Sequence, residues 1–271
     1  MTFINGTEVG GNAALLPNTW YHLVATYDGS SVKFYVNGQF QNSADKSDLI
    51  DTSTGNLYIG DYGGSLGSSA YNFKGIIDEV RIYNRALSEE EIKAHYLANK
   101  DNYPSWSKVD NTSEITKHTV PASYYYDGGA VGIWKFDEGS GSTAFDSSRS
   151  GNIGTLYDAN TSNSDGNTPP QWVSGKYGKA LEFDGIDDYV EVADSSSLQP
   201  TEFSVELWFR RFNNDTNYEG IITKWEQSGY YGFIIQSMPD GSVRAVLGAG
   251  DENEPCLASL PRASLSSLSS E

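Results

Sequence analysis

An antiparallel pair of strands is predicted by two consecutive runs, Trp20-Tyr21-His22-Leu23-Val24-Ala25-Thr26-Tyr27-Asp28-Gly29 and Lys33-Phe34-Tyr35-Val36-Asn37-Gly38. Alternation in the first run puts His22 and Val24 on one face of the strand, and Leu23 and Ala25 on the other. Asp-Gly and Asn-Gly then end the two runs, and both dipeptides favour tight reversals because their residues tolerate a positive φ. The chain therefore begins as β-sheet material.

Further strands follow in two segments. In the first segment they are expected at residues 57–60 and 73–83, and Ser88 then begins a short helix in which Glu91 completes a Ser-x-x-Glu capping box. In the second segment we expect strands near residues 131–137, 179–193, 203–211, 219–225, 231–237 and 242–248. Because several of these strands have unlike faces, the pattern predicts an all-β fold with two packed antiparallel sheets and one short helix.

Polar and turn-forming residues divide the chain. We predict structural units at residues 1–97 and 130–250, a polar linker at 98–129 and a disordered tail at 251–271. The tail is rich in Ser, Leu and Ala without a usable period. The organisation is thus two strand-rich segments on either side of a tether.

The composition limits the classes of partner that the protein is expected to bind. The 271 residues carry a formal net charge of −18, which repels phosphate backbones and anionic lipid surfaces, so we expect no nucleic-acid partner. No apolar run is long enough to span a bilayer, so no membrane insertion is expected. Cys256 is the only cysteine, which excludes an intrachain disulfide.

Both segments carry motifs of one family. The first ends in Gly75-Ile76-Ile77-Asp78-Glu79-Val80-Arg81-Ile82-Tyr83-Asn84-Arg85-Ala86-Leu87-Ser88, and the second contains Val131-Gly132-Ile133-Trp134-Lys135-Phe136-Asp137-Glu138-Gly139-Ser140-Gly141, Ala180-Leu181-Glu182-Phe183-Asp184-Gly185 and Phe203-Ser204-Val205-Glu206-Leu207-Trp208-Phe209. The first segment resembles the closing half, and the second the opening half, of a laminin-G-like jelly roll of the concanavalin A-like lectin/glucanase superfamily. The opening half comes second.

Two interpretations of this order stay open. The chain is either a piece of a tandem array cut inside two copies, or a circular permutant in which both segments complete one sandwich. Each half alone would leave an apolar sheet face in water, at a cost on the order of 10 kcal/mol. We therefore expect one closed sandwich, and the same complementarity permits strand-swapped pairing with like domains.

The resemblance implies a Ca²⁺ ion near the rim of the sandwich, held by carboxylate and carbonyl oxygens. The candidate ligands are Asp78, Asp137, Asp184 and Asp187, with Glu79, Glu138 and Asp188 beside them. The alternative is that these acidic side chains form turns and bind backbone N–H groups.

The resemblance also implies sugar recognition by loop aromatics. The candidates near strand ends are Tyr62, Tyr71, Trp225 and Tyr230. Sugar C–H faces stack on exposed rings of this kind, but aromatics that follow the strand alternation belong to the core instead.

Catalysis has little support in the sequence. The superfamily's glucanases are recognised by a Glu-x-Asp-x-Glu strand, and this chain has no such run. We therefore expect a non-catalytic carbohydrate-binding or adhesion module of an extracellular or cell-surface protein, with a glycan or an extracellular protein as partner. The alternatives are a structural spacer or protein-binding repeat without a sugar site and, less favoured, part of a glycoside hydrolase.

Overall fold

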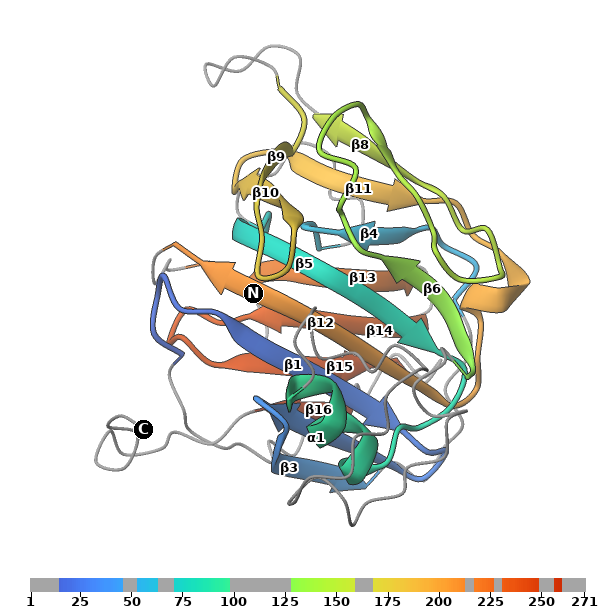
Figure 1. Cartoon of the computed structure of the whole chain (residues 1–271). Coiled ribbons are helices and arrows are strands. Elements are labelled where there is room, and N and C mark those ends of the chain that lie inside the picture. The colour runs from blue at the N-terminus through green and yellow to red at the C-terminus, as the bar shows by residue number, and fades with distance from the viewer. Residues whose placement is uncertain are drawn as a thin grey trace, which may run out of the picture.

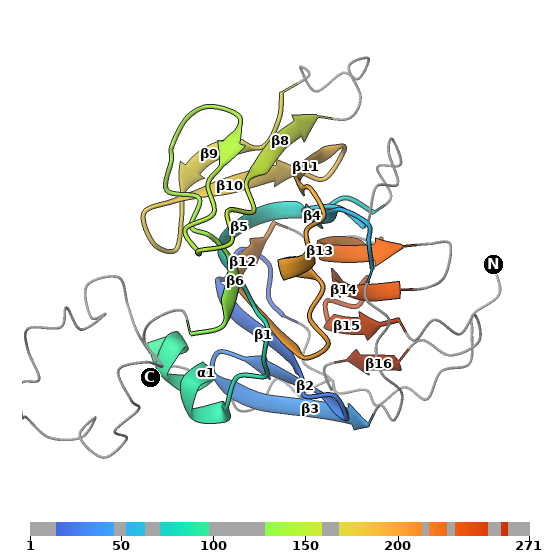
Figure 2. The same ribbon diagram turned by 90° about the vertical axis from the view of Figure 1, so that its right-hand side faces the viewer.

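Two stacked antiparallel sheets and one helix make up the fold in the computed structural model (Figures 1 and 2). The structure describes residues 15–45, 53–62, 71–97, 128–158, 168–212, 217–226, 231–248 and 256–259. The all-β, two-sheet prediction is confirmed.

The front sheet has eight strands. In spatial order they are β3 (Gln39–Asp45), β2 (Ser31–Val36), β1 (Tyr21–Tyr27), β12 (Phe203–Arg211), β5 (Lys74–Tyr83), β10 (Lys179–Asp184) and β9 (Gln171–Ser174), and β6 (Ala130–Trp134) also pairs with β5.

The back sheet also has eight strands. In order they are β16 (Cys256–Ser259), β15 (Val243–Leu247), β14 (Tyr231–Ser237), β13 (Glu219–Glu226), β4 (Leu57–Ile59), β11 (Asp188–Val192), β8 (Gly154–Asp158) and β7 (Thr143–Ala144). A short 3₁₀ turn, η1 (Ser196–Leu198), follows β11. Strand β16 lies within the stretch that the sequence assigned to a tail, and the rest of that stretch is outside the described residues.

Both sheets combine strands of the two segments. In the front sheet β12 lies between β1 and β5, with Leu23 opposite Leu207 and Ile82 opposite Val205. In the back sheet β4 lies between β13 and β11. Neither segment therefore has a sheet of its own. The permuted order relative to the family stays a prediction, and of the predicted linker only residues 128 and 129 are described.

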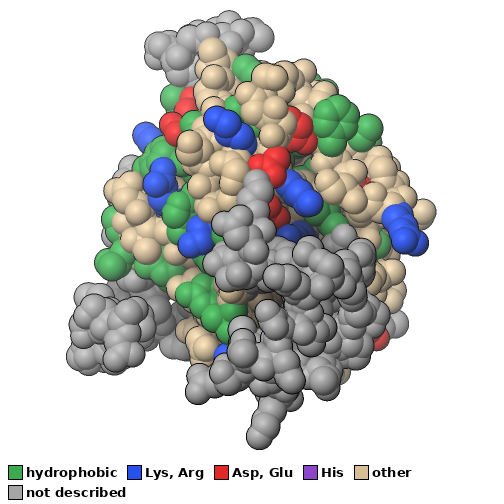
Figure 3. Space-filling model, viewed as in Figure 1, with side chains coloured by type: hydrophobic (Ala, Val, Ile, Leu, Met, Phe, Trp, Pro, Cys, Tyr) green, Lys and Arg blue, Asp and Glu red, His purple; other side chains and the backbone are tan. Residues whose placement is uncertain are grey.

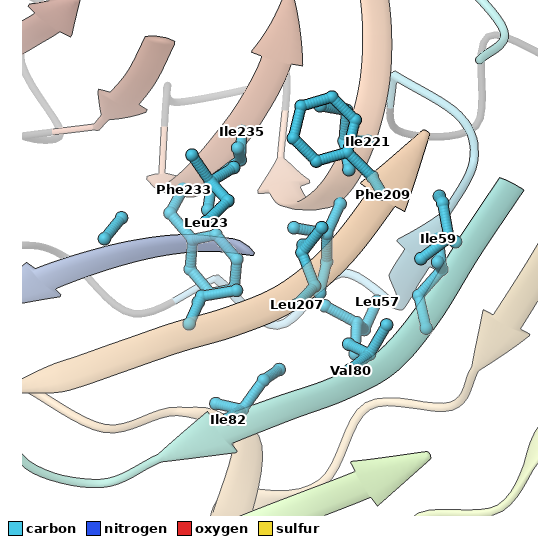
Figure 4. Packing of buried hydrophobic residues seen from close by; sticks show 14 of the residues in the cluster. Leu23, Leu57, Ile59, Val80, Ile82, Leu207, Phe209, Ile221, Phe233 and Ile235 are labelled. Atoms are coloured by element: carbon cyan, nitrogen blue, oxygen red, sulfur yellow. The ribbon is translucent and has the colours of Figure 1, made fainter. Parts of the chain in front are cut away.

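One apolar core fills the space between the sheets. It includes Leu23 and Ile82 from the first segment and Leu207 and Phe233 from the second, and all of them are almost completely buried (Figure 4). The apolar faces that each segment alone would leave in water thus cover each other.

Helix α1 (Glu89–Leu97) covers part of the outer face of the front sheet (Figure 2). The predicted capping box is confirmed: the Ser88 amide donates to Glu91 Oε2 at 2.8 Å and the Glu91 amide donates to Ser88 Oγ at 3.2 Å. Ile92 of the helix packs in a second apolar cluster with Val24 and Tyr35. Both faces of β1 are buried for this reason, one by the core and one by the helix.

No helix in the described ranges has the length and apolar character needed to cross a membrane.

Candidate functional site

Acidic and aromatic side chains meet at one rim of the sandwich, where strands β8 and β10 end and β11 and β13 begin. The pairing register puts Asp158, the last residue of β8, opposite Asp188, the first residue of β11. Strand β4 ends at this rim as well, because it runs antiparallel to both β11 and β13. The tertiary structure thus collects residues from both sequence segments here.

Three aspartates form the centre of this rim. One carboxylate oxygen from each of Asp184, Asp187 and Asp188 lies within 4.8 Å of the other two. The turn is fixed locally, because the Ile186 amide donates to Asp184 Oδ1 at 2.7 Å and the Asp184 amide donates to Asp188 Oδ2 at 3.0 Å. Gly185 has a φ of +79° and touches Lys74 closely, which leaves no room for a side chain. We call this group the aspartate cluster.

The aspartate cluster concentrates negative charge in a buried place. Asp187 and Asp188 are 1% and 3% exposed, and Asp188 Oδ1 has no hydrogen-bond partner among the described residues. Burial, together with the charge of Asp184, raises the pKa of Asp188 to about 8, and the charges of Asp187 and Asp158 add to this effect.

The donor set of the aspartate cluster fits a hard divalent cation. Such a cation binds several oxygen ligands, Asp carboxylates among them, and its charge would offset the repulsion between them. The Oδ1 atom of Asp188 supplies a buried acceptor that the protein's described groups leave unused. This arrangement is therefore best suited to binding a cation.

Two of the four predicted metal ligands lie elsewhere. Asp78, in the middle of β5, is fully buried and accepts a hydrogen bond from the Tyr177 amide at 2.9 Å. Asp137 accepts from the Lys179 amide at 2.9 Å, and Lys179 begins β10, at the strand's other end from Asp184. Both therefore bind backbone N–H groups, as the turn-forming alternative expects, while Asp184 and Asp187 meet in the cluster.

Two of the predicted aromatics also lie at the rim. Tyr62 follows β4, and its ring centroid lies 5.3 Å from that of Tyr71. The Gly220 amide of β13 donates to the Tyr71 carbonyl at 2.8 Å, which attaches this segment to the start of β13. Burial raises the pKa of Tyr62, and both rings are partly exposed. The tyrosine pair and the aspartate cluster thus share one end of the back sheet.

Of the other two predicted aromatics, only one is described, and it lies away from this rim. Trp225 lies near the far end of β13 and is half-buried. Tyr230 lies outside the described residues.

Two further groups were missed by reasoning from sequence. On the outer face of the front sheet, the buried Glu206 carboxylate contacts His22 and His95. On the back sheet, the ring of Tyr189 lies 5.3 Å from Tyr157 and 5.8 Å from Tyr58. Strand alternation places each residue on a face, but only cross-strand register shows which of them touch.

Comparison with known proteins agrees with this fold. Residues 2–93 match the family model Laminin_G_3, described as the concanavalin A-like lectin/glucanases superfamily, so the resemblance of the first segment is confirmed. An 88-residue stretch is 33% identical to Pappalysin-1 of Mus musculus; the match covers 32% of this chain and 5% of that protein. No solved structure gives a significant match.

Proposed function

We propose, from the laminin-G-like match and the rim geometry, that the chain is a non-catalytic carbohydrate-binding module of an extracellular or cell-surface protein. In this proposal Ca²⁺ binds the aspartate cluster, and a neutral glycan binds beside it against Tyr62 and Tyr71. The observation that carries the proposal is that one rim holds both the buried carboxylates and the tyrosine pair.

The two groups supply complementary chemistry for a sugar. Partly exposed tyrosine rings offer apolar surface to sugar C–H groups and hydroxyls that can hydrogen-bond. A bound Ca²⁺ would orient the carboxylates and neutralise part of their charge, which favours approach of hydroxyl-rich ligands to an acidic protein. The formal charge of −18 argues for a neutral glycan rather than an acidic one.

A non-catalytic role is supported by the burial of two carboxyl groups outside the cluster, those of Asp78 and Glu206. Asp78 is fully buried beneath the turn that carries Tyr177, and Glu206 is 4% exposed beneath α1. Glycoside cleavage needs two carboxyl groups that reach the same glycosidic bond, so buried residues of this kind are unsuited to it. The alternative of a spacer or protein-binding repeat predicts no response to sugars.

The test is binding to a panel of immobilised polysaccharides in Ca²⁺ and in a chelator. We expect binding in Ca²⁺ and its loss in the chelator. D188N should weaken binding about tenfold through loss of a ligand charge, and Y62A about fivefold through loss of stacking surface. Calorimetric titration with Ca²⁺ alone should separately show binding to the wild type and weaker binding to D188N.

The matched control is F145A. Phe145 is 58% exposed and follows β7, whose pairing places it at the opposite rim from Asp188. This variant should bind both Ca²⁺ and sugar like the wild type. Flat responses to every polysaccharide would overturn the sugar role, and equal Ca²⁺ binding by D188N would overturn the cation site.

A further inference from the structure

A buried carboxylate bridges two histidines beneath helix α1. Glu206 of β12 lies with Oε1 2.8 Å from Nε2 of His22 on β1, and with Oε2 2.8 Å from Nδ1 of His95 on α1. The three residues are 4%, 0% and 9% exposed, respectively. We call this group the histidine–glutamate cluster. On the coloured part of the face in Figure 3, Lys and Arg side chains lie interspersed with Asp and Glu side chains.

The cluster gives α1 a polar attachment to the sheet. Elsewhere the helix contacts the sheet through rings and apolar groups: Tyr96 stacks on Trp208 at 5.8 Å, and Ile92 packs against Val24 and Tyr35. The Arg85–Glu91 ion pair, with atoms 2.7 Å apart, fixes the start of the helix to the preceding loop. His95 therefore carries the hydrogen bond through which the last turn of α1 reaches β12.

Other titratable and charged groups lie on the helix and on the segments packed near the cluster. The hydroxyl of Tyr83 on β5 donates to Glu206 Oε2 at 3.4 Å. Lys176 Nζ lies 4.5 Å from the ring centroid of Trp208. The other groups are Tyr35 of β2 and, at the helix, Arg85, Glu91, Lys93 and Tyr96. Arg85 and Glu91 neutralise each other, and Lys93 is exposed. Glu206 is thus the carboxylate placed to balance charge on both imidazoles.

We propose that the histidine–glutamate cluster is a pH-sensitive clamp, which holds α1 on the sheet near neutral pH and releases it on acidification.

The charge balance explains the direction of the switch. With one imidazole protonated, the carboxylate and the imidazolium give a buried group of zero net charge. A proton on the second imidazole leaves a net positive charge in a place that excludes water, and such a charge is costly to bury. Burial alone would raise the pKa of Glu206, but the charge of His95 and the hydrogen bonds of both histidines hold it well below its usual range, so the carboxylate stays ionised.

Release of α1 uncouples only a small part of the fold. A nine-residue helix is marginal without packing partners, so α1 should lose its structure when its last turn leaves the sheet. The sheet beneath keeps its own strand pairing and its core on the other face. Acidification should therefore uncover the parts of Trp208 and Val24 that α1 contacts, while the sandwich stays folded.

The test is hydrogen exchange of the full chain between pH 8 and pH 5, corrected for intrinsic exchange rates. If opening takes up one proton, the opening equilibrium rises about tenfold for each pH unit below the titration point. We expect protection of residues 90–97 to fall with that slope, while β12 remains protected. H95Q should remove the pH dependence, and the control K93Q, which removes an exposed cation from the same helix, should keep it.

A second measurement follows the histidine rings directly by NMR. The ring resonances of His22 and His95 in the wild type should change over the same pH range in which the protection of α1 falls. The loss of one ring signal in H95Q identifies the signal of His95. Constant protection of α1 from pH 8 to pH 5, equal slopes in the wild type and H95Q, or ring resonances of His22 and His95 that stay constant while the protection of α1 falls would each overturn the clamp.

Discussion

At the scale of single residues, Asp78 shows how burial gives a carboxyl group a structural role. Its Oδ2 accepts from the Tyr177 amide, and the close approach of Gly175 leaves no space for a side chain there. Burial raises the pKa of Asp78 to about 8, the charge of Glu79 adds to this, and the backbone hydrogen bonds act in the opposite direction. The carboxyl group is therefore mostly protonated in the folded protein at neutral pH.

The pH dependence of stability follows from this shift. The folded pKa of about 8 lies above the value of about 3.9 for an unfolded aspartate, so the folded state holds the proton between these values. The contribution of Asp78 to stability thus falls as the pH rises from about 4 to about 8. D78N keeps an acceptor for the Tyr177 amide and cannot ionise. The melting temperature of D78N should therefore rise relative to that of the wild type from pH 5 to pH 8, and the difference should stay constant above pH 8. A constant difference across this range would contradict the assignment.

At the scale of elements, α1 begins at a capping box that can be recognised in the sequence. Ser88 and Glu91 satisfy each other's backbone N–H groups, which a helix start otherwise leaves free. The helix ends against the histidine–glutamate cluster, a contact that no local pattern encodes. Its two ends thus depend on different kinds of interaction.

S88A should destabilise the helix start by about 1 kcal/mol, because it removes the acceptor for the Glu91 amide. The control S88T keeps a hydroxyl in the same position and should lose only a small part of this. Hydrogen exchange of residues 89–93 near neutral pH measures both variants. Equal protection in S88A and the wild type would show that tertiary packing alone maintains the first turn.

At the scale of the whole molecule, the interleaved strands make the two segments one folding unit. Strand β12 contacts the first segment on both sides, through β1 and β5, and Leu207 within it is fully buried. Loss of either neighbour would leave unpaired backbone groups and an open core. The segments should therefore gain and lose structure together.

L207A should lower the free energy of unfolding by about 2–5 kcal/mol through the cavity it creates. The control L97A makes the same chemical change at the end of α1, where Leu97 is 63% exposed, and should have little effect. Urea unfolding followed by hydrogen exchange should show β1 and β13 losing protection in one transition. Separate transitions for these strands, or destabilisation confined to residues after 130, would contradict a shared fold.

Most strands could be predicted because their signals are local. The predicted strand at residues 203–211 has the bounds of β12, and the Ser88–Glu91 capping box forms as expected. The site could be predicted only in part. Asp184 and Asp187 lie in one turn, so their proximity in space follows from their short separation in the sequence. Asp78 and Tyr177, in contrast, are 99 residues apart in the sequence. Long-range partners depend on strand order, which local patterns do not specify.

The amino-acid sequence by itself determined the all-β class, the strand positions and the start of α1. It did so through its alternating apolar residues, its turn dipeptides and its helix cap. These features depend on neighbours within a few residues, and their physics is local. Only the tertiary structure decided that β12 lies between β1 and β5, that the aspartate cluster and the tyrosine pair share a rim, and that Glu206 bridges His22 and His95. Those contacts join residues far apart in the chain, and the burial of two complementary apolar faces against each other is what brings them together.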